Sequence, residues 1–104
     1  MELSAVTGFE WDAHNTDRNR AKHFVESQEC EEVFFHEPLV VVEDAKHSQD
    51  ESRFHALGKT STGRRLLLVF TIRADKIRVI SARPMSRKER EIYEYPVAGS
   101  EVQD

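Results

Sequence analysis

The sequence lacks the features that stabilise disulfide-rich and membrane-spanning proteins. Cys30 is its single cysteine, which excludes an internal disulfide and the scaffold of a small secreted domain. No apolar run reaches the roughly 18 residues of a membrane-spanning helix. The first residues show neither the basic start nor the long apolar centre of a signal peptide. We therefore expect a cytoplasmic protein that does not associate with membranes.

Glycine and proline are also scarce, with four and three residues among 104. The glycines do not form a phosphate-binding loop, and the five histidines and one cysteine lack metal-ligand spacing, so we expect no cofactor and no metal. Aromatic residues are spread along the chain, and 38% of all residues are hydrophobic. This composition predicts one globular domain over residues 1–96 and a flexible tail over residues 97–104.

The hydrophobic pattern predicts an α+β domain, in which a small antiparallel sheet carries two N-terminal helices and one C-terminal helix. Runs of β-branched and aromatic residues predict strands, and polar capping residues before amphipathic segments predict helices. The predicted strands are 9–11, 39–42, 53–59, 66–72 and 77–83, and the predicted helices are 12–23, 27–35 and 87–95, capped by Asp12, Ser27 and Ser86.

The last two strands are predicted to form a hairpin with its loop at residues 74–75. This loop places Thr71 opposite Arg78 and Arg73 opposite Lys76 on one face of the sheet. Two-residue hairpin loops need a positive φ, which strains alanine and therefore favours a longer loop here.

Positive charge is concentrated in the second half of the chain, although the net charge is −4. Residues 1–52 carry a net charge of −9, whereas residues 53–104 carry +5. The segment 64–90 holds nine basic residues against two acidic ones, and seven of the nine are arginines. The guanidinium group of arginine binds phosphate through two parallel hydrogen bonds. The segment therefore indicates a basic face for a polyanion or for an acidic protein partner.

Cleavage of RNA without a metal needs a group that deprotonates the 2′-hydroxyl, a group that protonates the leaving 5′-oxygen, and cations that stabilise the phosphorane. Such groups occur near the end of the first predicted helix and on the strands 53–59 and 77–83. The candidate catalytic residues are Lys22, His23, His47, Glu51, Arg53, Arg78 and Arg83, and the candidate RNA-binding residues are Arg64, Arg65, Arg73, Lys76 and Arg87.

These candidates also have structural explanations. Glu51 and Arg53 can form an exposed ion pair worth about 0–1 kcal/mol, and His47 and His55 are expected on the surface. Arg87 can belong to a solvated helix face.

Arg78 and Arg83 are predicted on opposite faces of their strand unless the strand bends. Arg83 can instead close the end of the sheet or pair with a glutamate of the helix 27–35. The polar residues that share one face of the first helix are expected to be solvated, and they are Asn15, Asn19 and Lys22.

Several short motifs follow one another along residues 9–95. They are Phe9-Glu10-Trp11-Asp12, Asn19-Arg20-Ala21-Lys22-His23, Val33-Phe34, Pro38-Leu39, Asp44, His47-Ser48, Glu51-Ser52-Arg53-Phe54 with Gly58, Thr71-Ile72-Arg73, Ile77-Arg78-Val79-Ile80-Ser81-Ala82-Arg83, and Arg87-Lys88-Glu89-Arg90 with Tyr93-Glu94. In their order and spacing, they make the chain resemble the BrnT family, toxins of type II toxin–antitoxin systems.

The resemblance implies a small ribonuclease of RelE-like fold that cleaves RNA and blocks translation. It also implies a cognate antitoxin with a ribbon-helix-helix domain, a 2:2 heterotetramer, and contact with operator DNA only through the antitoxin. By the same resemblance, Lys22 and Glu51 act as acid–base or positioning groups, and Arg53, Arg78 and Arg83 bind the scissile phosphate.

Three residues depart from the family pattern. Phe24 stands where glycine usually follows Lys-His, Ser27 stands where an aromatic residue is usual, and Ala74 replaces a turn glycine. The first two departures bear on the placement of Lys22 and His23.

Two other functions are compatible with the same basic face. One is a non-catalytic module that docks an acidic antitoxin segment. The other is a nucleic-acid-binding regulator, although the basic strands lack an aromatic stacking stripe.

Overall fold

The computed structural model describes residues 6–16, 23–47 and 51–94, and the predicted tail lies outside them. The elements are β1 (Gly8–Phe9), α2 (Ser27–Val33), β2 (Val40–Glu43), the 3₁₀ helix η2 (Ala45–His47), β3 (Arg53–Lys59), β4 (Arg65–Arg73), β5 (Lys76–Pro84) and α3 (Arg87–Glu94). Residues 13–16 are also helical. In the described part of the chain, no helix is long and apolar enough to cross a membrane.

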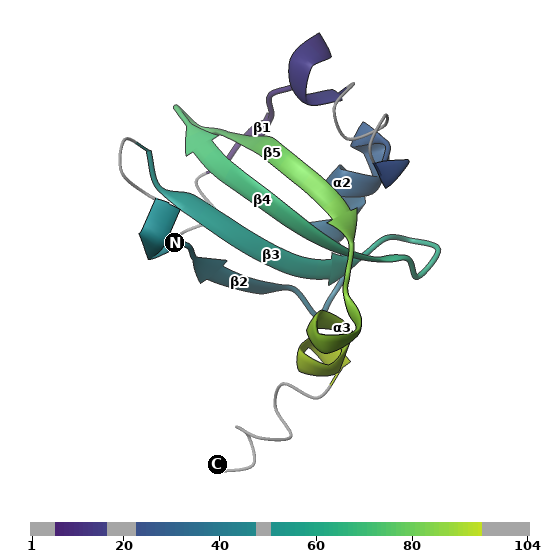
Figure 1. The fold of residues 1–104 in the computed structure, drawn as a ribbon. Helices are drawn as coiled ribbons and strands as arrows, with labels where there is room; N and C mark the ends of the chain where they lie inside the picture. Colours follow the sequence, from purple (N-terminus) through teal and green to yellow (C-terminus); the bar gives the residue numbers. More distant parts are fainter. Residues whose placement is uncertain (1–5, 17–22, 48–50, 95–104) are drawn as a thin grey trace.

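The five strands form one sheet in the order β1-β5-β4-β3-β2 (Figure 1). Strands β2 to β5 are antiparallel neighbours, as predicted. The prediction of an entirely antiparallel sheet is wrong, because β1 pairs in parallel with β5. In the described part of the chain, β1 has two residues, Gly8 and Phe9. The alternation of side chains along so short a segment indicates a strand but not the direction of its partner. The fold is therefore α+β with a mixed sheet.

Two helix caps follow the prediction and one does not. The Asp12 carboxylate accepts a hydrogen bond from the backbone N–H of Asn15, and the Ser86 hydroxyl accepts one from the N–H of Glu89. Helix α2, in contrast, has Glu26 at its N-cap, so the assignment of Ser27 as the cap is wrong. The Glu29 carboxylate accepts the N–H of Glu26 instead, as in a capping box.

Helix α2 covers one face of the sheet, and this face holds the main hydrophobic core. The rings of Phe34 and Phe70 meet edge to face at 5.1 Å, and Phe54 stacks on Phe70 at 5.4 Å. A Cβ atom at Gly58 would lie 2.6 Å from Val33 Cγ1, which explains why a glycine stands where α2 crosses β3.

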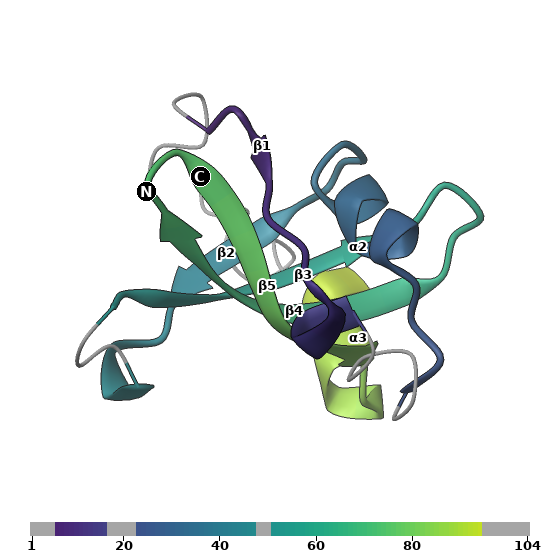
Figure 2. The same ribbon diagram turned by 90° about the horizontal axis from the view of Figure 1, so that it is seen from above.

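Helix α3 lies on the opposite side of the sheet from α2 (Figure 2). It packs on one end of that face, where Leu57, Leu67, Met85 and Tyr93 form a small second core. The Tyr93 hydroxyl donates a hydrogen bond to the carbonyl of Pro38 at 2.6 Å. We call this side the α3 face. Neither α2 nor α3 covers its other end, near the β4–β5 turn.

Candidate functional site

Strand register brings two predicted arginines into one row on the α3 face. Thr71 on β4 lies opposite Arg53 on β3 and also opposite Arg78 on β5. Directly opposed residues project from the same face, and neighbouring strands are about 5 Å apart. Arg73 and Lys76 form the next pair on this face, as predicted. We call these four basic residues, together with Glu51, the hairpin-end cluster.

Glu51 is bound by Arg73 within this cluster. The guanidinium group of Arg73 donates two hydrogen bonds to the Glu51 carboxylate, at 2.9 and 3.2 Å. These bonds, with the nearby charges of Arg53 and Arg78, hold the pKa of Glu51 below its usual value. The carboxylate is therefore ionised at neutral pH and is a weak proton acceptor.

Arg78 is the most enclosed cation of the cluster, with a side chain only 12% exposed. Its Nη2 atom lies 3.0 Å from a carboxylate oxygen of Asp12, and Nη1 lies 3.8 Å from Glu10. Nη1 is buried and has no hydrogen-bond partner among the described residues. The acidic segment before the first helix therefore sits against this arginine.

Asn15 fixes that acidic segment to the sheet. Its side-chain amide donates hydrogen bonds to the carbonyls of Val79 and Glu10, and the residue is 2% exposed. The prediction of a solvated helix face is therefore wrong at Asn15, because this face meets the edge of β5. The rest of that predicted face, Asn19 and Lys22, lies outside the described residues.

A β-bulge places Arg83 on the same face as Arg78. The register between β4 and β5 shifts by one residue at Ile80, so that Arg83 lies opposite Leu67. The expectation of opposite faces holds only for a regular strand, and the extra residue reverses it. The partner positions Leu67 and Thr71 are four steps apart along β4, so the arginines lie roughly 13 Å apart along the strand.

Arg83 is held at the α3 end of this face. Its guanidinium group donates two hydrogen bonds of 2.8 Å to Glu89. This contact contributes most to lowering the pKa of Glu89 to about 2. The prediction that Arg83 pairs with a glutamate of the helix 27–35 is wrong. Glu89 is the partner because it follows Arg83 closely in the chain and is already oriented by its bond to the N–H of Ser86 at the start of α3. Arg83 therefore lies apart from the hairpin-end cluster.

Three other basic candidates, Arg64, Arg65 and Arg87, also lie outside the cluster. Arg64 donates hydrogen bonds to the carbonyls of His23 and Phe24 and to the carboxylate of Glu29. It thus ties the chain before α2 to the start of β4. Arg65 pairs with Glu94, and Arg87 lies 3.8 Å from Glu91, both at α3. Lys22 falls outside the described residues, and nothing is described of the side chain of His47.

Two of the residues that depart from the family pattern have a left-handed backbone. Phe24 and Ala74 both have φ of +57°. Ala74 and Asp75 form the two-residue hairpin loop, so the loop is not longer than two residues. Glycine adopts this conformation without a steric cost, whereas phenylalanine and alanine do not.

Sequence reasoning did not single out a histidine–aspartate pair on the α3 face. His55 Nε2 lies 3.1 Å from a carboxylate oxygen of Asp44. Side chains alternate along a strand, so His55 lies on the same side of β3 as Arg53, and this is the signal that the sequence contains. The partner comes from the segment after β2, and no local pattern indicates that pairing.

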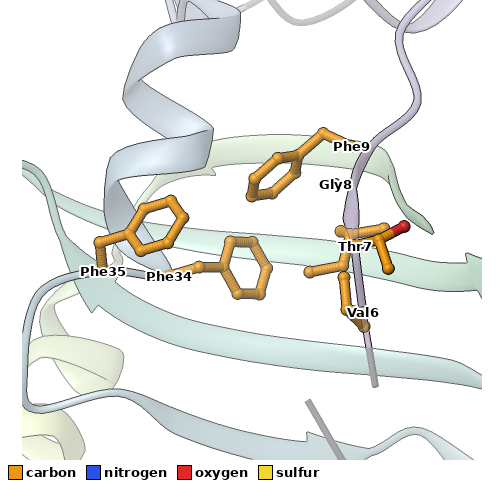
Figure 3. A pocket seen from close by; sticks show the side chains of 7 residues that line it. Val6, Thr7, Gly8, Phe9, Phe34 and Phe35 are labelled. Atoms are coloured by element: carbon orange, nitrogen blue, oxygen red, sulfur yellow. The ribbon is translucent and has the colours of Figure 1, made fainter. Parts of the chain in front are cut away.

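The described pocket near β1 has a different character. It has a volume of about 250 Å³ and is lined by Val6, Thr7, Gly8, Phe9, Phe34, Phe35 and Ile77. Figure 3 shows the rings of Phe9, Phe34 and Phe35 gathered around it. None of its lining residues is charged, so it offers no acid–base chemistry.

Comparison with known proteins identifies the family. A family model described as the ribonuclease toxin BrnT of type II toxin–antitoxin systems matches residues 11–89. No curated protein matches the sequence. The matched segment contains Arg53, Arg73 and Arg78 and most of the fold. The chain therefore belongs to the BrnT family of ribonuclease toxins of type II toxin–antitoxin systems.

Proposed function

We propose that this protein is a metal-independent RNA endonuclease whose active centre is the uncovered end of the α3 face. Family membership makes RNA the substrate class. The observation that carries the proposal is the row formed by Arg53, Thr71 and Arg78. Guanidinium groups on both sides of one residue can bind a single phosphate from two directions.

Two cations of the cluster, Arg73 and Arg78, are paired with carboxylates, and a phosphate can replace these carboxylates. The side chains of Arg73 and Glu51 are 50% and 38% exposed, and such ion pairs contribute only about 0–1 kcal/mol. Asp12 is also half exposed beside Arg78. A phosphate oxygen would replace Glu51 at Arg73 at small cost, and at the more enclosed Arg78 it would displace Asp12 from the exposed side of the pair. Arg53 is exposed on the face itself and would meet the RNA first.

In the proposed reaction, the 2′-hydroxyl attacks the adjacent phosphorus. Arg53 and Arg78 stabilise the negative charge of the phosphorane, and the products are a 2′,3′-cyclic phosphate and a 5′-hydroxyl. Glu51 fits the role of a positioning residue for Arg73, since its depressed pKa makes it a weak base. Lys22 and His23 stay candidates for acid–base or positioning roles. Arg83 was expected at the scissile phosphate, but its place beside Glu89 at α3 favours a contact with RNA beyond that phosphate.

The biological setting is proposed from the family. The toxin would act in the cytoplasm, block translation by cutting RNA, and share the RelE-like fold. A ribbon-helix-helix antitoxin would neutralise it in a 2:2 complex and would alone contact operator DNA. Arg64, Arg65 and Arg87 would serve the fold or the flanks of the RNA path, because each is paired with a carboxylate away from the cluster.

The test is incubation of the full chain with a single-stranded RNA in EDTA, followed by analysis of the product ends. We expect cleavage with cyclic phosphate ends. Arg53→Ala and Arg78→Ala should each slow cleavage by about 10²-fold or more, as for the loss of one charge-stabilising donor. Arg90→Ala is the matched control, because Arg90 is an exposed arginine on α3.

Two results would contradict the proposal. One is RNA that stays intact at every concentration of a protein whose folding is confirmed by circular dichroism. That outcome would favour the non-catalytic module that docks an antitoxin. The other is cleavage by the Arg53 and Arg78 variants at the rate of the Arg90 control, which would move the active centre elsewhere.

A further inference from the structure

The pair formed by His55 and Asp44 lies on the same face as the proposed active centre. His55 follows Arg53 by two residues on β3, so both project from the α3 face. Phe54 between them points into the core, where it stacks on Phe70. This confirms the alternation, and it places an imidazole group beside the arginine row.

The imidazole group is accessible, whereas its carboxylate partner is not. The side chain of His55 is 44% exposed, and that of Asp44 is 13% exposed. Val42, which lies opposite His55 on β2, is 60% exposed, so the neighbouring strand does not cover the ring. A bound RNA strand could therefore reach the imidazole but not the aspartate.

The hydrogen bond to Asp44 selects the tautomer of the ring. The ring nitrogen of His55 that contacts Asp44 is Nε2. A carboxylate accepts hydrogen bonds, so in the neutral ring Nε2 carries the hydrogen atom and Nδ1 keeps a lone pair. The backbone N–H of Asp44 also donates to the carbonyl of Arg53 at 2.7 Å, which fixes the segment that carries the aspartate. Nδ1 of the neutral ring is thus the nitrogen that can accept a proton, on a side chain that is 44% exposed.

The spacing suits one RNA linkage. The Cα atoms of His55 and Arg53 are about 7 Å apart along the strand, and Arg78 lies about 10 Å from Arg53 across two strands. Long arginine side chains extend over such distances. A phosphate held by Arg53 and Arg78 would bring the neighbouring ribose close to the ring.

We propose that His55 is the general base of the RNA cleavage and that Asp44 is its positioning residue, an inference that rests on the nuclease function proposed above. Nδ1 takes the proton of the 2′-hydroxyl as the 2′-oxygen bonds to phosphorus. The bond from phosphorus to the 5′-oxygen breaks, and this oxygen takes a proton from water. The hydroxide left behind and the proton on His55 then recombine, so that no atom or charge is left over.

A purely structural role predicts different behaviour. In that case, the His55–Asp44 hydrogen bond only joins β3 to the segment after β2. Glutamine at position 55 would retain a hydrogen-bond donor for Asp44 but has no basic nitrogen. His55→Gln therefore separates the two roles, and His55→Ala opens space for an added base.

The experiment measures cleavage of a short RNA by the full chain in EDTA at neutral pH. We expect His55→Gln and His55→Ala to lower kcat by about 10²–10⁴-fold, the usual contribution of a positioned base, with KM changed only a few-fold. Added imidazole should restore part of the activity that His55→Ala has lost. It should leave the activity of the parent protein unchanged. His36→Ala is the control, because His36 follows α2 and its ring forms a hydrogen bond with the carbonyl of Glu32, away from the arginine row.

The outcomes separate this inference from the function on which it rests. Full activity of His55→Gln would overturn the catalytic role of His55 while leaving the nuclease function intact. Loss of activity in His55→Ala without any rescue by imidazole would also overturn it. An inactive parent protein would overturn both proposals.

Discussion

Replacing Ala74 by glycine should stabilise the protein. Ala74 is the first residue of the two-residue β4–β5 loop and has φ of +57°. The methyl group of Ala74 contributes little packing energy there, because the residue is exposed at the tip of the hairpin. The loop carries Arg73 and Lys76 on its two sides, so its conformation also determines where these cations lie.

The size of the effect follows from two opposing terms. A left-handed backbone costs an L-residue with a Cβ atom about 1–2 kcal/mol. Glycine removes this cost but gives the unfolded chain more entropy, worth about 0.4–1 kcal/mol. The free energy of unfolding should therefore rise by about 0.5–1 kcal/mol. For a domain of this size, that raises Tm by roughly 2–8 °C.

Two glycine substitutions provide matched controls. Gly63 has φ of +88°, and a Cβ atom there meets nothing within 4 Å. Gly63→Ala should therefore lower Tm through the backbone alone. A Cβ atom at Gly8 also meets nothing within 4 Å, and the backbone there is not left-handed. Gly8→Ala should therefore leave Tm unchanged or raise it slightly.

Thermal unfolding followed by circular dichroism measures all three variants, and urea unfolding checks that the m value stays constant. The reasoning is refuted if Ala74→Gly leaves Tm unchanged or lowers it while Gly63→Ala behaves as expected. Such a result would mean that the loop relaxes to another conformation when the methyl group is removed.

Two further predictions concern other parts of the chain. Phe24→Gly should raise the free energy of unfolding by about 0.5–1 kcal/mol, because Phe24 has φ of +57° and a side chain that is 78% exposed; a lower Tm by circular dichroism would show that its ring contributes more than its backbone costs. Glu89→Gln should destabilise the protein at pH 7. The pKa of Glu89 is lowered to about 2 mainly by Arg83, so its contribution is complete above about pH 5 and disappears as the pH falls toward 2. Urea unfolding of parent and variant should therefore differ at pH 7 and converge near pH 2, and a difference independent of pH would contradict the assigned pKa.

Local sequence patterns predicted much of the fold. The strand 53–59 has the predicted bounds, and the pairing of Thr71 with Arg78 and of Arg73 with Lys76 is confirmed. The caps at Asp12 and Ser86 are confirmed as well. These features depend on side-chain alternation and on hydrogen bonds between residues three or four apart, which a sequence contains directly.

The candidate site was predicted only in part. Arg53, Glu51 and Arg78 were singled out together, and the hairpin-end cluster places them near one another. Arg83 was joined to them, yet it lies at α3 with Glu89. Charge counting cannot tell an arginine that is available to a ligand from one that is already paired. Such pairing depends on which segments meet after folding.

The sequence by itself determined the antiparallel strands, the caps at Asp12 and Ser86, the uneven distribution of charge and the family. The tertiary structure alone decided that the bulge at Ile80 turns Arg83 to the face of Arg78. It also decided that β1 runs parallel to β5, and that Asp44 meets His55. The physical reason is the range of the interactions: periodicity is a property of neighbouring residues, whereas an inserted residue or a partner from another strand takes effect only through packing of the whole sheet.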